Sequence, residues 1–163
     1  MKLLHLLRHA KSSWDDTDLA DHERPLAPRG LKASQLIAAH VQTAGIAPEL
    51  VLCSTALRAR QTLAALVPVL DGDVEIRLEG ALYGAGRLEV LARVREVDDA
   101  VSSLLVIGHN PTLHELALFL SGDADALERF PTGALASLAL STGWAALDEG
   151  GADLQGFVVP REL

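Results

Sequence analysis

The chain contains one cysteine among its 163 residues, Cys53, so it cannot form an internal disulfide bond and gives no support to secretion. No apolar run approaches the roughly 20 residues that a membrane-spanning helix needs. Met1 and Lys2 are followed directly by a strand-like segment, without the apolar stretch and cleavage site of a signal peptide. We therefore expect a cytoplasmic protein with no membrane partner.

Positive charge is also scarce, because 14 Lys and Arg residues face 22 Asp and Glu residues and the formal net charge is −8. This balance disfavours nonspecific binding to nucleic acids or anionic membranes. Any site for an anion must therefore be a local concentration of positive charge within an acidic surface. The proportions of hydrophobic residues (49%) and charged residues (22%) are typical of a folded protein. The length fits one domain, residues 1–163, and we expect a monomer.

Apolar runs and turn residues alternate along the chain in a way that predicts an α/β protein. Short apolar runs predict strands at residues 2–7, 50–53, 74–77, 103–107, 135–141 and 156–159. Helical spacing and end signals predict helices at residues 28–44, 56–66, 88–97 and 111–120, with Thr55 and Asn110 as N-caps and Pro111 as a first helical residue. Strands that alternate with helices indicate a three-layer α/β/α sandwich around a largely parallel mixed sheet.

Cationic side chains follow three of the predicted strands at their carboxyl ends. Arg8 and His9 follow the first strand, Arg58 comes shortly after the second, and His109 follows the strand at 103–107. Ligands of open α/β sheets bind at the carboxyl ends of the strands. Two arginines and two histidines gathered there predict a pocket for a small dianion, and a phosphoryl group fits best.

These residue types suit phosphoryl transfer, which needs an in-line nucleophile and positive charge around the remaining oxygens. Arg8 and Arg58 offer planar forks of N–H donors that match phosphate oxygens. His9 can attack phosphorus through one ring nitrogen, and we expect the other to donate to a backbone carbonyl, for which that of Ala10 is the candidate. We expect a protonated His109 beside the dianion to supply one more donor.

Two predicted helix ends support the pocket. Arg58 falls in the first turn of its helix, where a cation opposes the helix dipole by about 0.3–1 kcal/mol. Such a locally unfavourable choice often marks function. The helix that begins at Asn110 and Pro111 would point free backbone N–H groups toward the same place, which favours an anion.

The motifs around these residues resemble those of the histidine phosphatase superfamily, which includes the cofactor-dependent phosphoglycerate mutases. The segment Arg8-His9-Ala10-Lys11-Ser12 resembles the signature Arg-His-Gly-x-Ser/Thr, with alanine in place of the usual glycine. The motifs of the second arginine and second histidine are matched by Ser54-x-x-Leu57-Arg58-Ala59-x-x-Thr62 and Gly108-His109-Asn110. Further similarity, to the SixA-type phosphohistidine phosphatases, lies in Arg24-Pro25-Leu26, Arg29-Gly30, Asn110-Pro111-Thr112 and Phe130-Pro131-Thr132-Gly133.

This resemblance implies a phosphoglycerate mutase-like fold and a covalent phosphohistidine intermediate on His9, with Arg8, Arg58 and His109 in the phosphate pocket. In the mutase-like branch a glutamate after the third strand protonates the leaving alkoxide. Glu79 is the local candidate, although its spacing to the following Tyr-Gly pair departs from the pattern. General acid help is worth about 10²–10⁴-fold and matters most for an alkoxide. A site without a firm acid would favour phosphohistidine, whose imidazole leaves more easily.

The leading hypothesis is a metal-independent phosphatase without a cofactor, whose substrate is phosphohistidine on a protein such as a histidine phosphotransfer domain. The alternatives are a small-molecule phosphomonoesterase or a mutase of the same superfamily, and a noncatalytic phosphate-binding module. A phosphatase of the Cys-x5-Arg type is disfavoured, because only four residues separate Cys53 from Arg58 and none is glycine. We interpret Cys53 as a structural thiol, since burial in an apolar strand suppresses the thiolate.

Other polar residues have structural or peripheral interpretations. His5 alternates with leucines in a strand and is expected in the core. Ser12 is expected either to bind phosphate or to hold its loop through bonds to the backbone. His22 and Arg24 lie in the first long loop and are candidates for the pocket rim. Trp14 is expected to pack and anchor the same loop.

Overall fold

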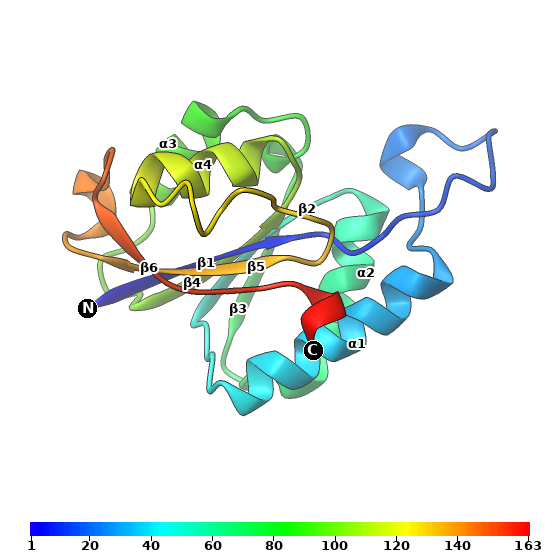
Figure 1. Cartoon of the computed structure of the whole chain (residues 1–163), viewed down its shortest axis with the longest axis horizontal. Coiled ribbons are helices and arrows are strands. Elements are labelled where there is room, and N and C mark those ends of the chain that lie inside the picture. The colour runs from blue at the N-terminus through cyan, green and yellow to red at the C-terminus, as the bar shows by residue number, and fades with distance from the viewer.

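The computed structural model describes residues 1–163 and shows a six-stranded sheet between two pairs of helices (Figure 1). The strands are β1 (Lys2–Arg8), β2 (Leu50–Ser54), β3 (Glu75–Glu79), β4 (Ser103–Gly108), β5 (Leu135–Leu140) and β6 (Ala152–Val158). The helices are α1 (Pro28–Thr43), α2 (Leu57–Leu66), α3 (Arg87–Arg95) and α4 (Thr112–Ser121). None of them combines the length and the apolar character that crossing a bilayer requires.

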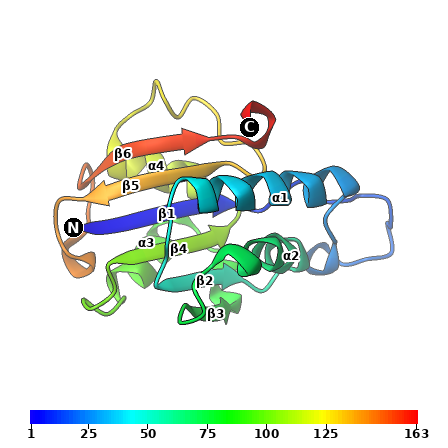
Figure 2. The same ribbon diagram turned by 90° about the horizontal axis from the view of Figure 1, so that it is seen from below.

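The strand order, β3-β2-β4-β1-β5-β6, places three site-bearing strands side by side. The strands β3, β2, β4 and β1 run parallel to one another, whereas β5 is antiparallel to both β1 and β6. The carboxyl ends of β2, β4 and β1 therefore meet at one edge of the sheet. The loop of residues 9–27 extends beyond this edge (Figure 2). The predicted three-layer sandwich with a largely parallel mixed sheet is confirmed.

Two hydrophobic cores hold the helices on opposite faces of the sheet. Leu4 and Leu6 of β1 belong to the core that contains apolar side chains of α3 and α4. Leu7, on the other face, packs with the core that includes Ile37 of α1 and Leu63 of α2. This alternation follows from the two-residue period of a strand, which sends successive side chains to opposite faces. The sheet is covered on both faces, as Figure 1 shows, so its central parallel strands β2 and β4 are buried along their whole length.

His5 lies in this interior, as expected, with 3% of its surface exposed. Its Nδ1 atom lies 2.8 Å from the hydroxyl oxygen of Ser137 in the neighbouring strand β5. Its Nε2 atom is buried without a hydrogen-bond partner in the protein. Burial lowers the pKa of His5 to about 4. The ring is therefore neutral at physiological pH.

The starts of two helices differ from the predictions. Helix α2 begins at Leu57, so Thr55 is not its N-cap, and the Thr55 hydroxyl instead contacts His22 Nε2 at 2.8 Å. Helix α4 begins after Pro111, which occupies the N-cap position and not the first helical one. Asn110 stands one residue further back, but its side-chain oxygen still accepts a 3.3 Å bond from a backbone N–H of the first turn. Tertiary contacts of the polar side chains thus override the local capping preferences.

Strand β6 is longer than the predicted 156–159 and begins at Ala152. It pairs only with β5, and the ladder contains a register shift beside Ser137. Gly156 and the polar residues of this edge strand hide the strand signal, because glycine and aspartate are depleted in strands. The segment predicted to be irregular, 142–155, therefore supplies the first half of a strand.

Candidate active site

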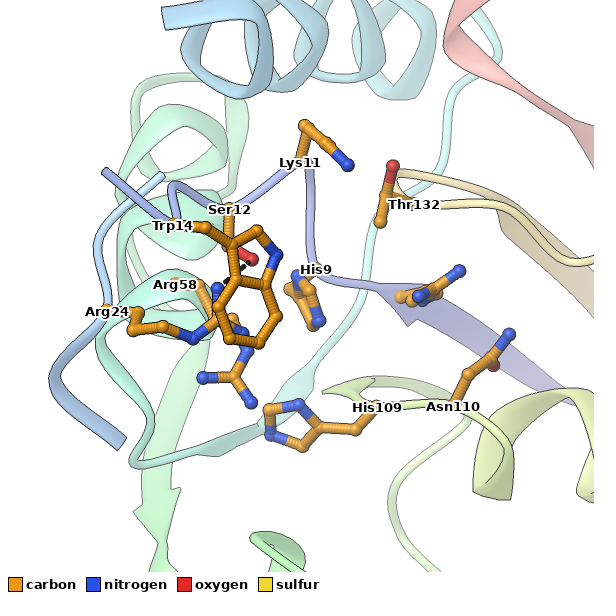
Figure 3. A pocket seen from close by; sticks show the side chains of 10 residues that line it. His9, Lys11, Ser12, Trp14, Arg24, Arg58, His109, Asn110 and Thr132 are labelled. Atoms are coloured by element: carbon orange, nitrogen blue, oxygen red, sulfur yellow. Dashed lines mark hydrogen bonds between the residues drawn. The ribbon is translucent and has the colours of Figure 1, made fainter. Parts of the chain in front are cut away.

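A pocket of about 240 Å³ opens at the carboxyl edge of the sheet, where β1, β2 and β4 end. It brings together all four residues predicted to bind and transfer the phosphoryl group. Its lining contains no aspartate or glutamate, so its charge is positive. The lining residues are Arg8, His9, Lys11, Ser12, Trp14, Arg24, Arg58, His109, Asn110 and Thr132 (Figure 3).

Hydrogen bonds hold both the ring of His9 and the backbone of His9 and Ala10 in place. Its Nδ1 atom lies 2.7 Å from the carbonyl oxygen of Ala10, as predicted, so Nδ1 carries a proton and donates it. The backbone N–H of His9 donates to the carbonyl of Gly108, and that of Ala10 donates to the hydroxyl of Thr62. Ala10 needs no positive φ, which explains why alanine can replace the usual glycine here. This arrangement leaves the lone pair of Nε2 available for attack.

The pKa of His9 is lowered to about 3. Burial is the largest cause, because a charged imidazole loses its hydration there. The bond to the Ala10 carbonyl acts in the opposite direction, while His109, Arg58 and Arg8 lower the pKa further through their charges. His9 is therefore a neutral imidazole over the whole physiological range, which is the form that a nucleophile requires.

Two guanidinium groups supply fixed positive charge beside His9. Arg8 donates from Nη1 to the carbonyl oxygen of Phe130 at 3.1 Å, and Arg58 donates from Nη1 to that of Asp21 at 2.7 Å. The Nε atoms of Arg8 and Arg58 are buried without a protein partner. Burial and the charge of Arg58 lower the pKa of Arg8. Because buried donors are normally satisfied, these unpartnered N–H groups favour an anionic ligand.

His109 faces His9 across the pocket, with ring centroids 5.2 Å apart. Its Nε2 atom lies 2.7 Å from the hydroxyl oxygen of Ser54, at the end of β2. Burial, followed by the charge of Arg58, lowers its pKa to about 4. In the free pocket His109 is therefore neutral. Its expected protonation beside a dianion stays a prediction, since that state depends on the charge of the bound anion.

Asp21, to which we assigned no role from the sequence, is the main anionic contact of the site. Its Oδ2 atom accepts bonds from Arg58 Nη2 at 3.0 Å and from the Tyr83 hydroxyl at 2.7 Å. Its Oδ1 atom accepts from Arg24 Nε at 3.1 Å. The bond from Tyr83, together with those from both arginines, holds the pKa of Asp21 well below its usual range. Asp21 thus orients Arg58 and has no proton to donate.

The long loop is held by polar side chains around the pocket. Arg24 lines the pocket and donates from Nη1 to the hydroxyl of Ser12 at 2.9 Å and to the carbonyl of Ser13 at 3.0 Å. Ser12 therefore holds the loop and also reaches the pocket. Trp14 packs within its own loop, where the guanidinium of Arg24 stacks on its ring at 3.4 Å, although 66% of its surface is exposed. His22 is not a lining residue, but its ring meets the edge of Tyr83.

Glu79, the candidate general acid, lies at the end of β3 outside the pocket lining. Its carboxylate accepts two hydrogen bonds from Arg93 of α3, with Nη2–Oε1 and Nε–Oε2 distances of 2.7 and 2.8 Å. Both carboxylate oxygens of Glu79 are therefore engaged by one guanidinium group in a bidentate ion pair. The geometry places Glu79 in a structural contact between β3 and α3.

The structure offers neither a reactive cysteine nor a cluster of metal ligands. Cys53 is fully buried, and burial raises the pKa of its thiol to about 12, in agreement with a structural thiol. No group of three or more His, Cys, Asp or Glu side chains is arranged to hold a metal ion.

Comparison with known proteins agrees with this geometry. Residues 4–91 match the histidine phosphatase superfamily (branch 1). An uncharacterised protein of Mycobacterium tuberculosis is 43% identical, over 95% of this chain and all of its own length. An uncharacterised chloroplastic protein of Arabidopsis thaliana is 33% identical, over 96% of this chain and 77% of its own length.

Solved structures similar to this chain narrow its position within the superfamily. A protein assigned as phosphohistidine phosphatase SixA, from Nakamurella multipartitia, has a TM-score of 0.87 and 34% identity, over 98% of this chain and 96% of its own. The structure of the protein histidine phosphatase SixA complexed with tungstate has a TM-score of 0.81 and 27% identity, over 98% of both chains. The matched residues include the pocket motif around His9. The chain therefore belongs to the histidine phosphatase superfamily, branch 1, has a phosphoglycerate mutase-like fold of the SixA type, and is a phosphatase.

Proposed function

We propose that this phosphatase removes the phosphoryl group from phosphohistidine on a protein, through a covalent intermediate on His9 and without a metal ion. The observation that carries the proposal is a pocket whose lining has three arginines and two histidines but no carboxyl group that could donate a proton. Asp21 is held in its charged form and Glu79 is bound by Arg93. Such a pocket stabilises phosphoryl oxygens but gives little help to an alkoxide leaving group.

The leaving group decides which substrate suits this pocket. A phosphohistidine ring that carries a proton on its second nitrogen leaves as a neutral imidazole and needs no acid from the enzyme. In the first step the lone pair of His9 Nε2 forms a bond to phosphorus, while the P–N bond of the substrate breaks and its electron pair returns to the leaving ring. Arg8 and Arg58 supply the positive charge that a metal ion would otherwise provide, and His109 adds to it once a bound dianion has favoured its protonation.

The second step returns the enzyme to its starting state. Water attacks the phosphorus of phosphorylated His9, the N–P bond breaks, and its electron pair returns to Nε2. The proton on Nδ1 stays on the ring throughout, held by the carbonyl of Ala10 at 2.7 Å. The ring therefore leaves as a neutral imidazole, and the product is dihydrogen phosphate, which balances both charge and atoms.

The test compares a phosphohistidine peptide with p-nitrophenyl phosphate, each with and without EDTA. We expect faster turnover of the peptide, no effect of EDTA, and an acid-labile, alkali-stable label on His9. His9→Ala should abolish both the label and turnover, whereas His40→Ala, a matched change in α1 outside the pocket, should leave both intact. Faster turnover of the ester would favour a small-molecule phosphomonoesterase, and inactivation by EDTA would exclude the metal-independent reaction. Binding of phosphate without labelling or turnover would indicate a noncatalytic module.

A further inference from the structure

A second depression, of about 360 Å³, adjoins the active-site pocket and shares Lys11 and Thr132 with it. Helix α1 forms one wall, and the segment before β5 together with the turn Pro160–Glu162 forms the other. Figure 3 shows Lys11 and Thr132 on the side of His9 away from His109. A chain that enters the pocket can therefore continue past Lys11 into this depression, which we call the basic groove.

The basic groove concentrates positive charge in an acidic protein. Five cations line it and no aspartate or glutamate does. None of the five takes part in an ion pair, although six of the other Lys and Arg residues do. Pocket and groove together hold eight of the chain's fourteen Lys and Arg residues. The five cations of the groove are Lys11, Arg29, Lys32, Arg129 and Arg161.

The cations of the groove, including the shared Lys11, are more exposed than the arginines of the pocket. Arg24 and Arg58 in the pocket are buried and held by hydrogen bonds. All five cations of the groove are exposed, and none donates a side-chain hydrogen bond within the protein. Exposed cations without hydrogen bonds to the protein are not fixed in place around one small anion. They suit an extended acidic surface, whose encounter they accelerate and orient.

The floor between these cations is partly apolar. Leu36 of α1 is 37% exposed and faces the groove, together with Pro131, Val159 and Pro160. An apolar strip with a cationic rim is complementary to a peptide segment that carries both apolar and acidic side chains. A small phosphorylated metabolite would not use this second depression once its phosphoryl group is in the pocket.

We propose that the basic groove docks an acidic segment that flanks the phosphorylated histidine of the protein substrate. The inference rests on the proposed function, because it needs a protein substrate. The inference adds what would select the protein substrate, which is negative charge on the substrate's own chain next to the phosphohistidine. The groove then acts mainly on KM and on the rate of association, while the pocket performs the chemistry.

The test uses two phosphohistidine peptides of equal length, one with glutamate and one with glutamine at the flanking positions. The variant is Arg29→Glu with Lys32→Glu, both exposed on the first turns of α1, where acidic residues are favourable to the helix. The control, Arg77→Glu with Arg87→Glu, changes the net charge equally on β3 and α3, away from the groove. We expect the groove variant to raise KM for the glutamate peptide by about tenfold. Its kcat, and turnover of the glutamine peptide and of p-nitrophenyl phosphate, should stay within about twofold.

Each other result overturns the docking proposal in a recognisable way. Equal KM values for both peptides, in wild type and variant, would show that the groove does not read flanking charge. Equal effects of the groove variant and the control would assign the change to net charge alone. Sedimentation with phosphatidylserine vesicles that needs Arg29 and Lys32, without any change in KM, would assign the groove to a lipid surface. Failure of wild type to act on either peptide, with p-nitrophenyl phosphate still turned over, would overturn the proposed substrate itself.

Discussion

His9, the proposed nucleophile, should remain unprotonated well below neutral pH. Burial, aided by His109, Arg58 and Arg8, lowers the pKa of His9 to about 3. A histidine with an ordinary pKa of about 6.5 would be about 97% protonated at pH 5. At the same pH His9 would be about 1% protonated. Between pH 8 and pH 5, kcat/KM should therefore fall less than about twofold from this cause, compared with about 30-fold for an ordinary histidine.

The assay is kcat/KM for p-nitrophenyl phosphate from pH 4.5 to 8, because phosphohistidine itself decomposes in acid. The separately measured ionisation of the substrate is divided out. Titration of the imidazole nitrogens by NMR in isotopically labelled protein gives the pKa of His9 independently. A corrected acid limb with a midpoint near pH 6.5, matched by the NMR titration of His9, would refute the reasoning. It would mean that water or an anion solvates the ring in the free enzyme.

Three further predictions concern residues around this chemistry. His5 has a folded pKa of about 4, below its unfolded value, so it contributes stability above pH 6.5 that is lost as pH falls toward 4. The free energy of unfolding in urea should fall by about 2 kcal/mol between pH 7 and pH 5 because of this residue, and His5→Asn should reduce that pH dependence. Asp21→Asn should loosen Arg58 and raise the inhibition constant for inorganic phosphate about tenfold; tighter inhibition would mean that the carboxylate competes with the anion. Glu79→Gln should break the contact with Arg93 and cost about 1 kcal/mol of stability, with kcat/KM for an alkyl phosphate such as glycerol phosphate within about twofold. A loss of about 10²-fold on the alkyl phosphate would instead identify Glu79 as the general acid.

The convergence of the main site residues could be predicted from the sequence because each follows an apolar strand. Arg8 ends β1, His9 and His109 directly follow β1 and β4, and Arg58 lies in the first turn of α2, the helix after β2. Ligands gather at this edge in parallel sheets. The sequence offered the carbonyl of Ala10 only as a candidate partner for the His9 ring, and the 2.7 Å contact in the structure fixes the tautomer. The order of the strands was not predicted, because periodicity says nothing about which strands are neighbours.

The position of Asp21 could not be predicted, because the loop that carries it has no periodic pattern. The loop is closed by long-range backbone bonds, from Ser13 N to the Pro25 carbonyl and from Ala27 N to the Lys11 carbonyl. Gly30 at the start of α1 approaches the Lys11 carbonyl so closely that any side chain there would clash. These contacts place Asp21 against an arginine 37 residues later in the chain. The one local signal was the arginine three residues after Asp21, which could equally have been an isolated surface pair.

Burial separates the two groups of cations into different roles, and salt should distinguish them. Exposed charges are screened over about 8 Å at physiological ionic strength, whereas buried charges are screened much less. Arg58 in the pocket is buried, so its effect on a bound phosphoryl group should persist at high salt. Arg29 and Lys32 in the groove are exposed, so any docking that depends on them should weaken steeply as salt rises. An acidic peptide and a small ester would then respond differently to the same salt. An equal loss of kcat/KM for the peptide and the ester as salt rises would indicate that the groove and the pocket act through the same electrostatic attraction.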